Sequence, residues 1–308
     1  MLDPKDIFPI GMGTWGLGGF AERNPDNNDT KQIDTLAYMF SKGFNFFEVS
    51  LWSAQGWSAK LIAKAIKESG INREDIFITE TIYTHNNPTL FDAIEESKRF
   101  LDIFETDYID SLGLSHAAFL DWNPISVYEF VENKLADKSA RYTSLTNSPL
   151  EFLKEYYTKF KDKLFAHEVG FNFEIRENFN LGIIPYGEDN GIKTVTYQPL
   201  RRNRTANRNW PVLVELSKKY DVSQNQIILA WILSKGYLPL TKSETISHID
   251  EHLESLKLKL DKEDLKRMDD FVPPGYNPPK VDWNRTGDGV RIDQLSNVFD
   301  EEYDKQTR

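Results

Sequence analysis

Cysteine is absent from the 308 residues, which excludes disulfides, thiol nucleophiles and thiolate metal sites. No apolar run approaches the roughly 20 residues that span a bilayer. The opening residues lack the basic patch and apolar segment of a secretory signal. These absences favour a cytoplasmic protein that contacts no membrane.

Positive charge is also scarce. The chain has 37 lysine and arginine residues against 48 aspartate and glutamate residues, for a formal net charge of −11. This balance argues against a general nucleic-acid binder, which needs a broad basic surface. No His-x-x-x-His or paired-acid spacing is present, so we predict no metal site.

A glycine-rich nucleotide-binding turn is missing as well. No Gly-x-Gly-x-x-Gly opens a helix after the first expected strand, which weakens the case for an open dinucleotide-binding sheet. Runs rich in β-forming residues instead alternate with helical patterns along the chain. Strands are expected over residues 7–15, 44–49, 76–79, 108–114, 141–145, 165–171, 194–197 and 237–240.

Several helices are marked by their first residues. Ser58 is expected to cap one helix, and Ser148-Pro149 another, with the proline at its first position. Ser223 and Gln226 form a capping-box pattern, and Asp261 is expected to cap the last helix. Other helical patterns cover residues 29–42, 89–101, 124–135, 247–256 and 262–271.

Eight strands, each followed by a helix, predict an α/β fold of the (β/α)8 TIM barrel type. The barrel is expected over about residues 7–271 within a single domain, 1–308. An open doubly wound sheet remains the alternative, because periodicity alone does not distinguish the two. Prolines and charges dominate after Phe271, so residues 272–308 are predicted to form an extended C-terminal tail over the barrel.

Several segments form an ordered series along the chain. They are Gly11-Met12-Gly13-Thr14-Trp15, residues 43–47, 73–79 and 107–110, Asn190-Gly191-Ile192, Tyr197-Gln198-Pro199-Leu200, and Lys242-Ser243 ahead of Ile249-x-Glu251. Together they resemble the aldo-keto reductase family. That family folds as a (β/α)8 barrel and reduces carbonyl groups with a nicotinamide cofactor, usually the phosphorylated form. The resemblance therefore implies a site for NADP(H).

The family's four reacting side chains are replaced at the matching positions. A tyrosine donates the proton in that family, helped by lysine, aspartate and histidine. The resemblance puts Glu48 at the aspartate, Ser53 at the tyrosine and Thr81 at the lysine. Ser115 stands at the histidine, with His116 one residue later, where a strand side chain faces the opposite way unless a bulge intervenes. A serine hydroxyl is a far poorer acid than a phenol, so ordinary carbonyl reduction is expected to be weak or absent.

The resemblance also implies cofactor contacts. Tyr197 matches an aromatic residue that stacks on the nicotinamide, and Thr146 with Asn147 matches a pair that binds its carboxamide. Glu168 replaces the family's glutamine, and an ionised carboxylate only accepts hydrogen bonds. At the adenosine end, the matching positions are Lys242 for the 2′-phosphate, Ser243 for the ribose, Glu251 for the adenine, and the substituted His248 and His252.

A basic loop follows the seventh expected strand. Arg201, Arg202 and Arg204 lie where barrel enzymes often bind phosphate, and arginine binds phosphate oxygens in pairs. We predict that this loop binds the cofactor's phosphates. Pairing of the arginines with surface carboxylates is the alternative.

Other side chains could replace the lost chemistry. Tyr83 is a candidate acid, together with His85 or His116 and Glu48, although each could be an ordinary loop residue. Trp15 and Trp52 are expected to line a pocket for a small molecule, with simple packing as the alternative.

Three functional interpretations follow. The first is a protein that binds NADP(H) but reduces carbonyls poorly, and the second is an oxidoreductase, lyase or isomerase with rewired acid–base groups. The third is a non-catalytic interaction protein built on a barrel. Retention of Tyr197, Lys242, Ser243 and Glu251 favours the first two.

Overall fold

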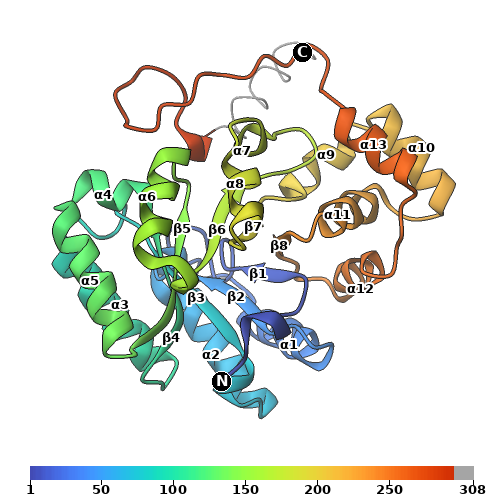
Figure 1. The fold of residues 1–308 in the computed structure, drawn as a ribbon. Helices are drawn as coiled ribbons and strands as arrows, with labels where there is room; N and C mark the ends of the chain where they lie inside the picture. Colours follow the sequence, from blue (N-terminus) through green and yellow to red (C-terminus); the bar gives the residue numbers. More distant parts are fainter. Residues whose placement is uncertain (295–308) are drawn as a thin grey trace.

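The computed structural model describes residues 1–294, in which eight parallel strands close into a barrel surrounded by helices (Figure 1). This confirms the predicted (β/α)8 fold and excludes the open sheet. The strands follow one another around the barrel in chain order. They are β1 (Gly11–Gly13), β2 (Phe46–Val49), β3 (Phe77–Ile82), β4 (Ile109–Ser115), β5 (Ala140–Thr146), β6 (Leu164–Gly170), β7 (Lys193–Tyr197) and β8 (Leu238–Thr241).

The first strand is shorter than predicted. Residues 7–10 precede β1 rather than belonging to it. Pro9 has no N–H to donate to a neighbouring strand, and the Phe8 N–H donates to the side chain of Asn45 at 2.7 Å. Only Gly11–Gly13 therefore pairs with β2 and β8.

Helices cover the outside of the barrel, and short ones also line its rim (Figure 1). The short helices α4, α7 and α9 were not expected from the sequence. The helices of the described residues are α1 (Asp29–Ser41), α2 (Trp57–Ser69), α3 (Leu90–Ile103), α4 (His116–Asp121), α5 (Pro124–Ala136), α6 (Leu150–Phe160), α7 (Glu177–Asn180), α8 (Ile183–Asp189), α9 (Arg204–Asn207), α10 (Pro211–Tyr220), α11 (Gln224–Ser234), α12 (Ile246–Ser255) and α13 (Lys262–Asp270). Within residues 1–294, no helix is long and apolar enough to cross a bilayer.

The predicted helix caps have mixed outcomes. The capping box of Ser223 and Gln226 is confirmed at the start of α11. The prediction for Ser58 is wrong, because α2 already begins at Trp57 and the Ser58 hydroxyl donates to the Ser53 carbonyl at 3.0 Å. Asp261 precedes α13 as predicted, but its carboxylate pairs with Lys219 instead of capping the helix.

The helix predicted to follow Ser148 begins one residue later than expected. Helix α6 begins at Leu150, so Pro149 lies just before the helix rather than at its first position. The Ser148 hydroxyl lies 2.9 Å from Nε2 of His167 on β6, which connects the end of β5 to the neighbouring strand.

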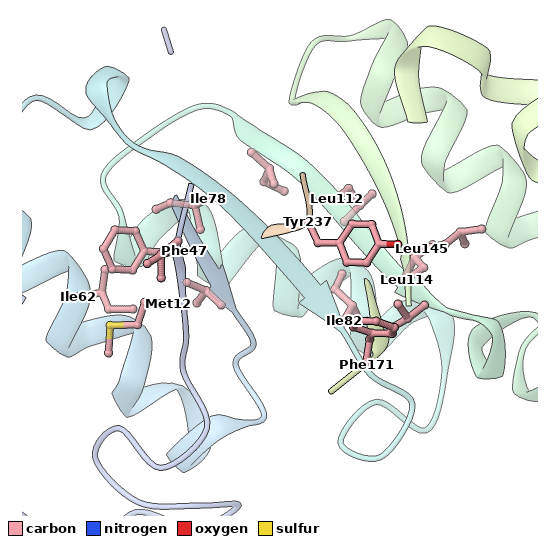
Figure 2. Close-up of a cluster of buried hydrophobic side chains, with 14 of the residues drawn as sticks. Met12, Phe47, Ile62, Ile78, Ile82, Leu112, Leu114, Leu145, Phe171 and Tyr237 are labelled. Atoms are coloured by element: carbon pink, nitrogen blue, oxygen red, sulfur yellow. The ribbon is translucent and has the colours of Figure 1, made fainter. Parts of the chain in front are cut away.

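Two apolar clusters hold the barrel together. The larger lies between the sheet and the helices, where Figure 2 shows Phe47 and Ile78 beside Ile62 of α2. The smaller fills the lower interior of the barrel around Phe46, Phe77 and Phe165, and the rings of Phe77 and Phe165 lie 4.6 Å apart. This interior cluster closes one end of the barrel, so a ligand can enter only at the opposite end.

The tail passes over the rim after α13 (Figure 1). Val281 and Val290 pair as an isolated bridge, and Arg285 forms an ion pair with Asp121 of α4 at 2.7 Å. Residues 272–294 thus follow the predicted extended path, while the predicted remainder, 295–308, lies outside the described residues.

Capping explains part of the local stability, and two threonines provide a matched test. Thr89 makes a full capping box with Asp92 at α3, whereas Thr245 precedes α12 without a side-chain cap. We expect Thr89→Ala to lower the free energy of unfolding by about 1 kcal/mol. Thr245→Ala should change it by less than about 0.5 kcal/mol. Urea unfolding measures both, and equal losses would contradict the assignment.

Candidate functional site

Most residues that the resemblance aligns with the reacting side chains, and several expected nicotinamide contacts, gather at one mouth of the barrel. Their strands end at the same side, as in all parallel barrels. In the sheet register, Glu48 pairs with Thr79, Thr81 with Gly113, Ser115 with Thr146, Thr146 with Glu168, and Gly170 with Tyr197.

Ser53 is buried in a tight turn after β2. Its neighbours Ala54 and Gln55 have φ angles of 49° and 56°, in the left-handed region that few non-glycine residues adopt. The Thr14 hydroxyl donates to the Ser53 hydroxyl at 3.3 Å. Ser53 is therefore a short hydroxyl held next to β1 and cannot replace a tyrosine side chain in length or acidity.

Glu48 lies inside the barrel next to Thr81. Burial raises the pKa of Glu48 to about 7, although the Thr81 hydroxyl and the Thr14 backbone favour the ionised form. Within residues 1–294, neither Oε1 of Glu48 nor the Thr81 hydroxyl makes a hydrogen bond of ordinary geometry. The carboxyl therefore lacks the basic partner that a lysine at position 81 would provide.

Glu168 is the second buried carboxyl at this mouth. Burial and the charge of Glu48 raise the pKa of Glu168 well above its ordinary value. Burial thus favours the protonated form, in which a carboxyl can both donate and accept hydrogen bonds. This differs from the acceptor-only carboxylate expected from the sequence.

His116 occupies the start of α4 rather than the end of β4. The β4–β5 register is continuous up to Ser115, without the bulge that would turn His116 inward. Its ring lies 4.8 Å from that of Phe152 on α6, and burial lowers its pKa despite a hydrogen bond with the Trp283 backbone. The structure therefore places His116 against α6 and the tail, while Ser115 ends the strand.

Aromatic side chains border the mouth near β1 and β2. The rings of Trp15 and Trp52 lie 4.6 Å apart, and Trp52 stacks on His85 at 4.9 Å. Tyr83 meets the Trp52 ring edge-on at 5.8 Å. Since Trp15 is 37% exposed, this aromatic group packs together and still presents a face to solvent.

The expected nicotinamide contacts are joined to one another. The Tyr197 hydroxyl donates to Oδ1 of Asn147 at 2.9 Å, and the Asn147 N–H donates to the Glu168 carbonyl at 3.0 Å. Thr146 is buried beside them. A cavity of about 10 Å³ next to Tyr197 is also lined by the tail residue Ile292. The tail therefore reaches the place where the resemblance puts the nicotinamide.

The basic loop folds back on an acid that sequence reasoning missed. The guanidinium of Arg201 is buried and pairs with the fully buried Glu174, which Arg208 also contacts at 2.8 Å. Glu174 accepts further hydrogen bonds from Thr205 and Trp210 at 2.8 and 2.6 Å. Arg201 thus pairs with a buried carboxylate rather than with the surface carboxylates of the alternative, and no local sequence pattern links it to an acid 27 residues away.

The other two predicted arginines lie at the surface. Arg202 is exposed and lies 5.5 Å from the centre of the Phe20 ring, and Arg204 at the start of α9 is also exposed. Because both side chains are exposed, a charged ligand can contact them, whereas the buried Arg201 already pairs with Glu174.

The expected adenosine contacts lie around β8 and α12. Lys242 pairs with Glu244, which also accepts a hydrogen bond from Gln32 at 2.7 Å. Glu251 accepts one from Ser223 at 3.2 Å, and Ser243 donates to the Thr245 carbonyl at 3.1 Å.

The two substituted histidines of this region differ in exposure. His248 is exposed, whereas burial and the charge of His248 lower the pKa of the buried His252 to about 4. His252 is therefore neutral at pH 7, whereas His248 and Lys242 are exposed basic groups at this end.

Comparisons with known proteins identify the family. A family model described as the aldo/keto reductase family matches residues 9–273. The methylglyoxal reductase DkgB of Yersinia pestis is 27% identical over 287 residues, covering 89% of this chain and all of the relative.

Solved structures give the same result. A thermostable aldo-keto reductase in complex with the inhibitor epalrestat is 26% identical and has a TM-score of 0.76, covering 85% of this chain and 94% of its own. An aldo/keto reductase from Klebsiella pneumoniae, solved with NADP and acetate, is 17% identical with a TM-score of 0.73 and covers 88% and 93% of the two chains. The last likeness supports the fold alone.

The buried acid of the basic loop leads to a stability prediction. Glu174→Gln removes the charge that Arg201 and Arg208 share, and an unpaired buried guanidinium is costly. We expect the free energy of unfolding to fall by about 3 kcal/mol or more. The exposed Arg202→Ala should cost less than about 0.5 kcal/mol. Comparable urea midpoints for Glu174→Gln and the unsubstituted protein would show that the cluster is not structural.

Proposed function

The chain belongs to the aldo/keto reductase family, and on that premise we propose that it binds NADP(H) across the barrel mouth with little or no carbonyl reduction by tyrosine chemistry. The observation that carries this proposal is the joined group of Thr146, Asn147, Glu168 and Tyr197. These residues offer an aromatic face and several hydrogen-bonding groups beside one another. The nucleotide, when bound, supplies the hydride.

The polar groups suit an amide ligand. Tyr197 offers its ring to the nicotinamide, and Thr146 and Asn147 lie next to it to bind the carboxamide. Because burial favours the protonated form of Glu168, its carboxyl can resemble the amide of a glutamine in offering both a donor and an acceptor. The change from glutamine to Glu168 is therefore compatible with the family's way of holding the nicotinamide.

At the other end, Lys242, Ser243 and Glu251 would hold the adenosine part, with His248 and His252 nearby. Arg202 and Arg204 would reach the phosphates, while Arg201 stabilises the loop through Glu174. Lys242 already has a carboxylate partner in Glu244, and a 2′-phosphate must compete with it. We therefore infer that the protein prefers NADP(H) over NAD(H) less strongly than it would if Lys242 had no carboxylate partner.

The residues at the family's reacting positions support the second half of the proposal, which is that the protein performs little or no carbonyl reduction by tyrosine chemistry. Ser53 and Thr81 carry aliphatic hydroxyls where the family has a phenol and an ammonium group. His116 packs against Phe152, so it is not placed to assist. A small-molecule ligand beside Trp15 and Trp52, a cytoplasmic location and the absence of nucleic-acid or membrane partners complete the proposal.

A cofactor titration tests this function. Quenching of tryptophan fluorescence is followed as NADPH or NADH is added at low salt, with Trp15 and Trp52 as the expected reporters. We expect micromolar binding of NADPH and a loss of at least about tenfold in Tyr197→Ala. The proposal fails if neither nucleotide binds up to about millimolar concentration.

The Lys242–Glu244 pair gives a specificity prediction. Glu244→Gln removes a negative charge next to the expected 2′-phosphate and releases Lys242. NADPH affinity should rise by roughly threefold to tenfold, since a nearby charge contributes about 1 kcal/mol. NADH affinity should not change, because NADH lacks that phosphate. Isothermal titration measures both, and an equal gain for the two nucleotides would contradict this role of Lys242.

Restoring two family side chains gives a functional prediction. The double variant Ser53→Tyr with Thr81→Lys places a phenol near the mouth and an ammonium group beside Glu48. We expect at least about a hundredfold gain in NADPH-dependent reduction of methylglyoxal, within the usual contribution of general acid catalysis. Thr81→Lys alone is the control and should gain little. If the double variant folds, binds NADPH and gains nothing, the replaced positions do not limit the chemistry.

A further inference from the structure

Two glutamates from opposite sides of the barrel point into its mouth. Glu48 lies near the end of β2 and Glu168 lies on β6, four strands away around the closed sheet. The ideal Cβ position of Gly13 on β1 lies 3.9 Å from Oε2 of Glu48, so this carboxyl is on the inner face. His167 next to Glu168 contacts Ser148 outside β6, and alternation along the strand turns Glu168 inward.

Small residues neighbour the Glu48 carboxyl. Gly13 on β1 pairs with Glu48, and Thr81 on β3 lies next to its carboxyl. Below them, the aromatic cluster of Phe46, Phe77 and Phe165 closes the barrel. Glu48 and Glu168 keep 8% and 6% exposure, which we attribute to the open mouth because the aromatic cluster lies on the other side. Both groups can therefore be reached by a ligand bound there.

No basic side chain offsets this pair. Among the described residues, the groups that influence the Glu48 carboxyl are Thr81 and the Thr14 backbone, and the only charge acting on Glu168 is that of Glu48. Two carboxyls in a site of low polarity do not both ionise readily, and they share one proton over a range of pH. One of them therefore remains an acid under conditions where an isolated surface carboxyl has lost its proton.

We propose that Glu48 and Glu168 form a carboxyl pair that holds one proton between them and gives it to the carbonyl oxygen of a small aldehyde or dicarbonyl substrate. The proposal rests on the nucleotide site proposed above. A bound reduced nicotinamide would supply the hydride to the carbonyl carbon, while the pair gives its proton to the carbonyl oxygen, so that the products are an alcohol and the oxidised nucleotide. Water at the mouth returns the proton to the pair, because two ionised carboxyls are unfavourable in this site.

The residues next to Glu48 favour this role. Thr81 and the Thr14 backbone neighbour the Glu48 carboxyl, and the Thr14 hydroxyl bonds to Ser53 in place of the longer tyrosine side chain of the family. Oε1 of Glu48 makes no hydrogen bond of ordinary geometry to the described residues. A substrate oxygen can thus become its partner without displacing another protein group.

A third buried glutamate provides a matched control. Glu80 is fully buried, and its pKa is raised to about 8 by burial and by the charge of Glu96. Its carboxyl, however, accepts a hydrogen bond from Ser97 of α3, outside the barrel. Glu80 therefore shares the burial of the pair but not its access to the mouth.

Infrared spectroscopy of the nucleotide-free protein tests the pair directly. The absorption of protonated carboxyl groups is followed from about pH 5 to about pH 9 in the unsubstituted protein and in Glu48→Gln, Glu168→Gln and Glu80→Gln. We expect Glu48→Gln to lower the pKa of Glu168 by at least about one unit, because the interacting charge is gone. Glu80→Gln should remove only its own absorption. Unchanged titration of Glu168 in Glu48→Gln would overturn the pairing.

Activity then tests the acid role. With NADPH and methylglyoxal, we expect slow reduction whose rate falls as pH rises above about 7, since the acid must be protonated. Both Glu48→Gln and Glu168→Gln should lose at least about tenfold, and Glu80→Gln should keep the rate and the pH profile.

Failure of this proposal is distinct from failure of the nucleotide site. If NADPH binds to the unsubstituted protein but Glu48→Gln keeps the rate and pH profile, the acid role is wrong while the proposed function stands. If NADPH does not bind at all, the nucleotide site is wrong, and the infrared titration still decides whether the carboxyls share a proton.

Discussion

The site depends on one constraint, the burial of two carboxyl groups inside a closed barrel without a basic partner. A lysine in place of Thr81 would pair with Glu48 and keep it ionised; the threonine hydroxyl does so only weakly. The charge of Glu48 in turn favours the protonated form of Glu168. Closure of the sheet imposes this arrangement, because it turns residues of β2 and β6 toward the same small space.

The burial of these two carboxyls affects both nicotinamide binding and acid–base chemistry at the barrel mouth. A protonated Glu168 keeps the donor and acceptor that a carboxamide needs, so a substitution that looks damaging is compatible with nicotinamide binding. The same proton becomes part of an acid group next to the reacting centre. The arginine loop is organised separately, since the buried Glu174 fixes Arg201 and Arg208 and leaves Arg202 and Arg204 at the surface.

Features that depend on local or periodic patterns could be predicted from the sequence. The barrel followed from alternating strands and helices, and the cap of α11 from Ser223 and Gln226. The placement of Thr146, Asn147 and Tyr197 at one mouth followed from family order. Three other features of the structure depend on tertiary contacts. The burial of Arg201 by Glu174, the turn of His116 toward Phe152 and the coupling of Glu48 with Glu168 join distant segments, and no local pattern encodes them.

A crystal structure grown with NADP⁺ at neutral pH tests the central claim most directly. The account predicts a nicotinamide ring stacked on Tyr197, its carboxamide bound by Asn147 and Glu168, and open space between the ring and the Glu48 carboxyl where a substrate oxygen fits. Ile292 of the tail would then move away from Tyr197 or pack against the ring. A nucleotide bound elsewhere, or a Glu168 carboxyl turned away from the carboxamide, would contradict the account.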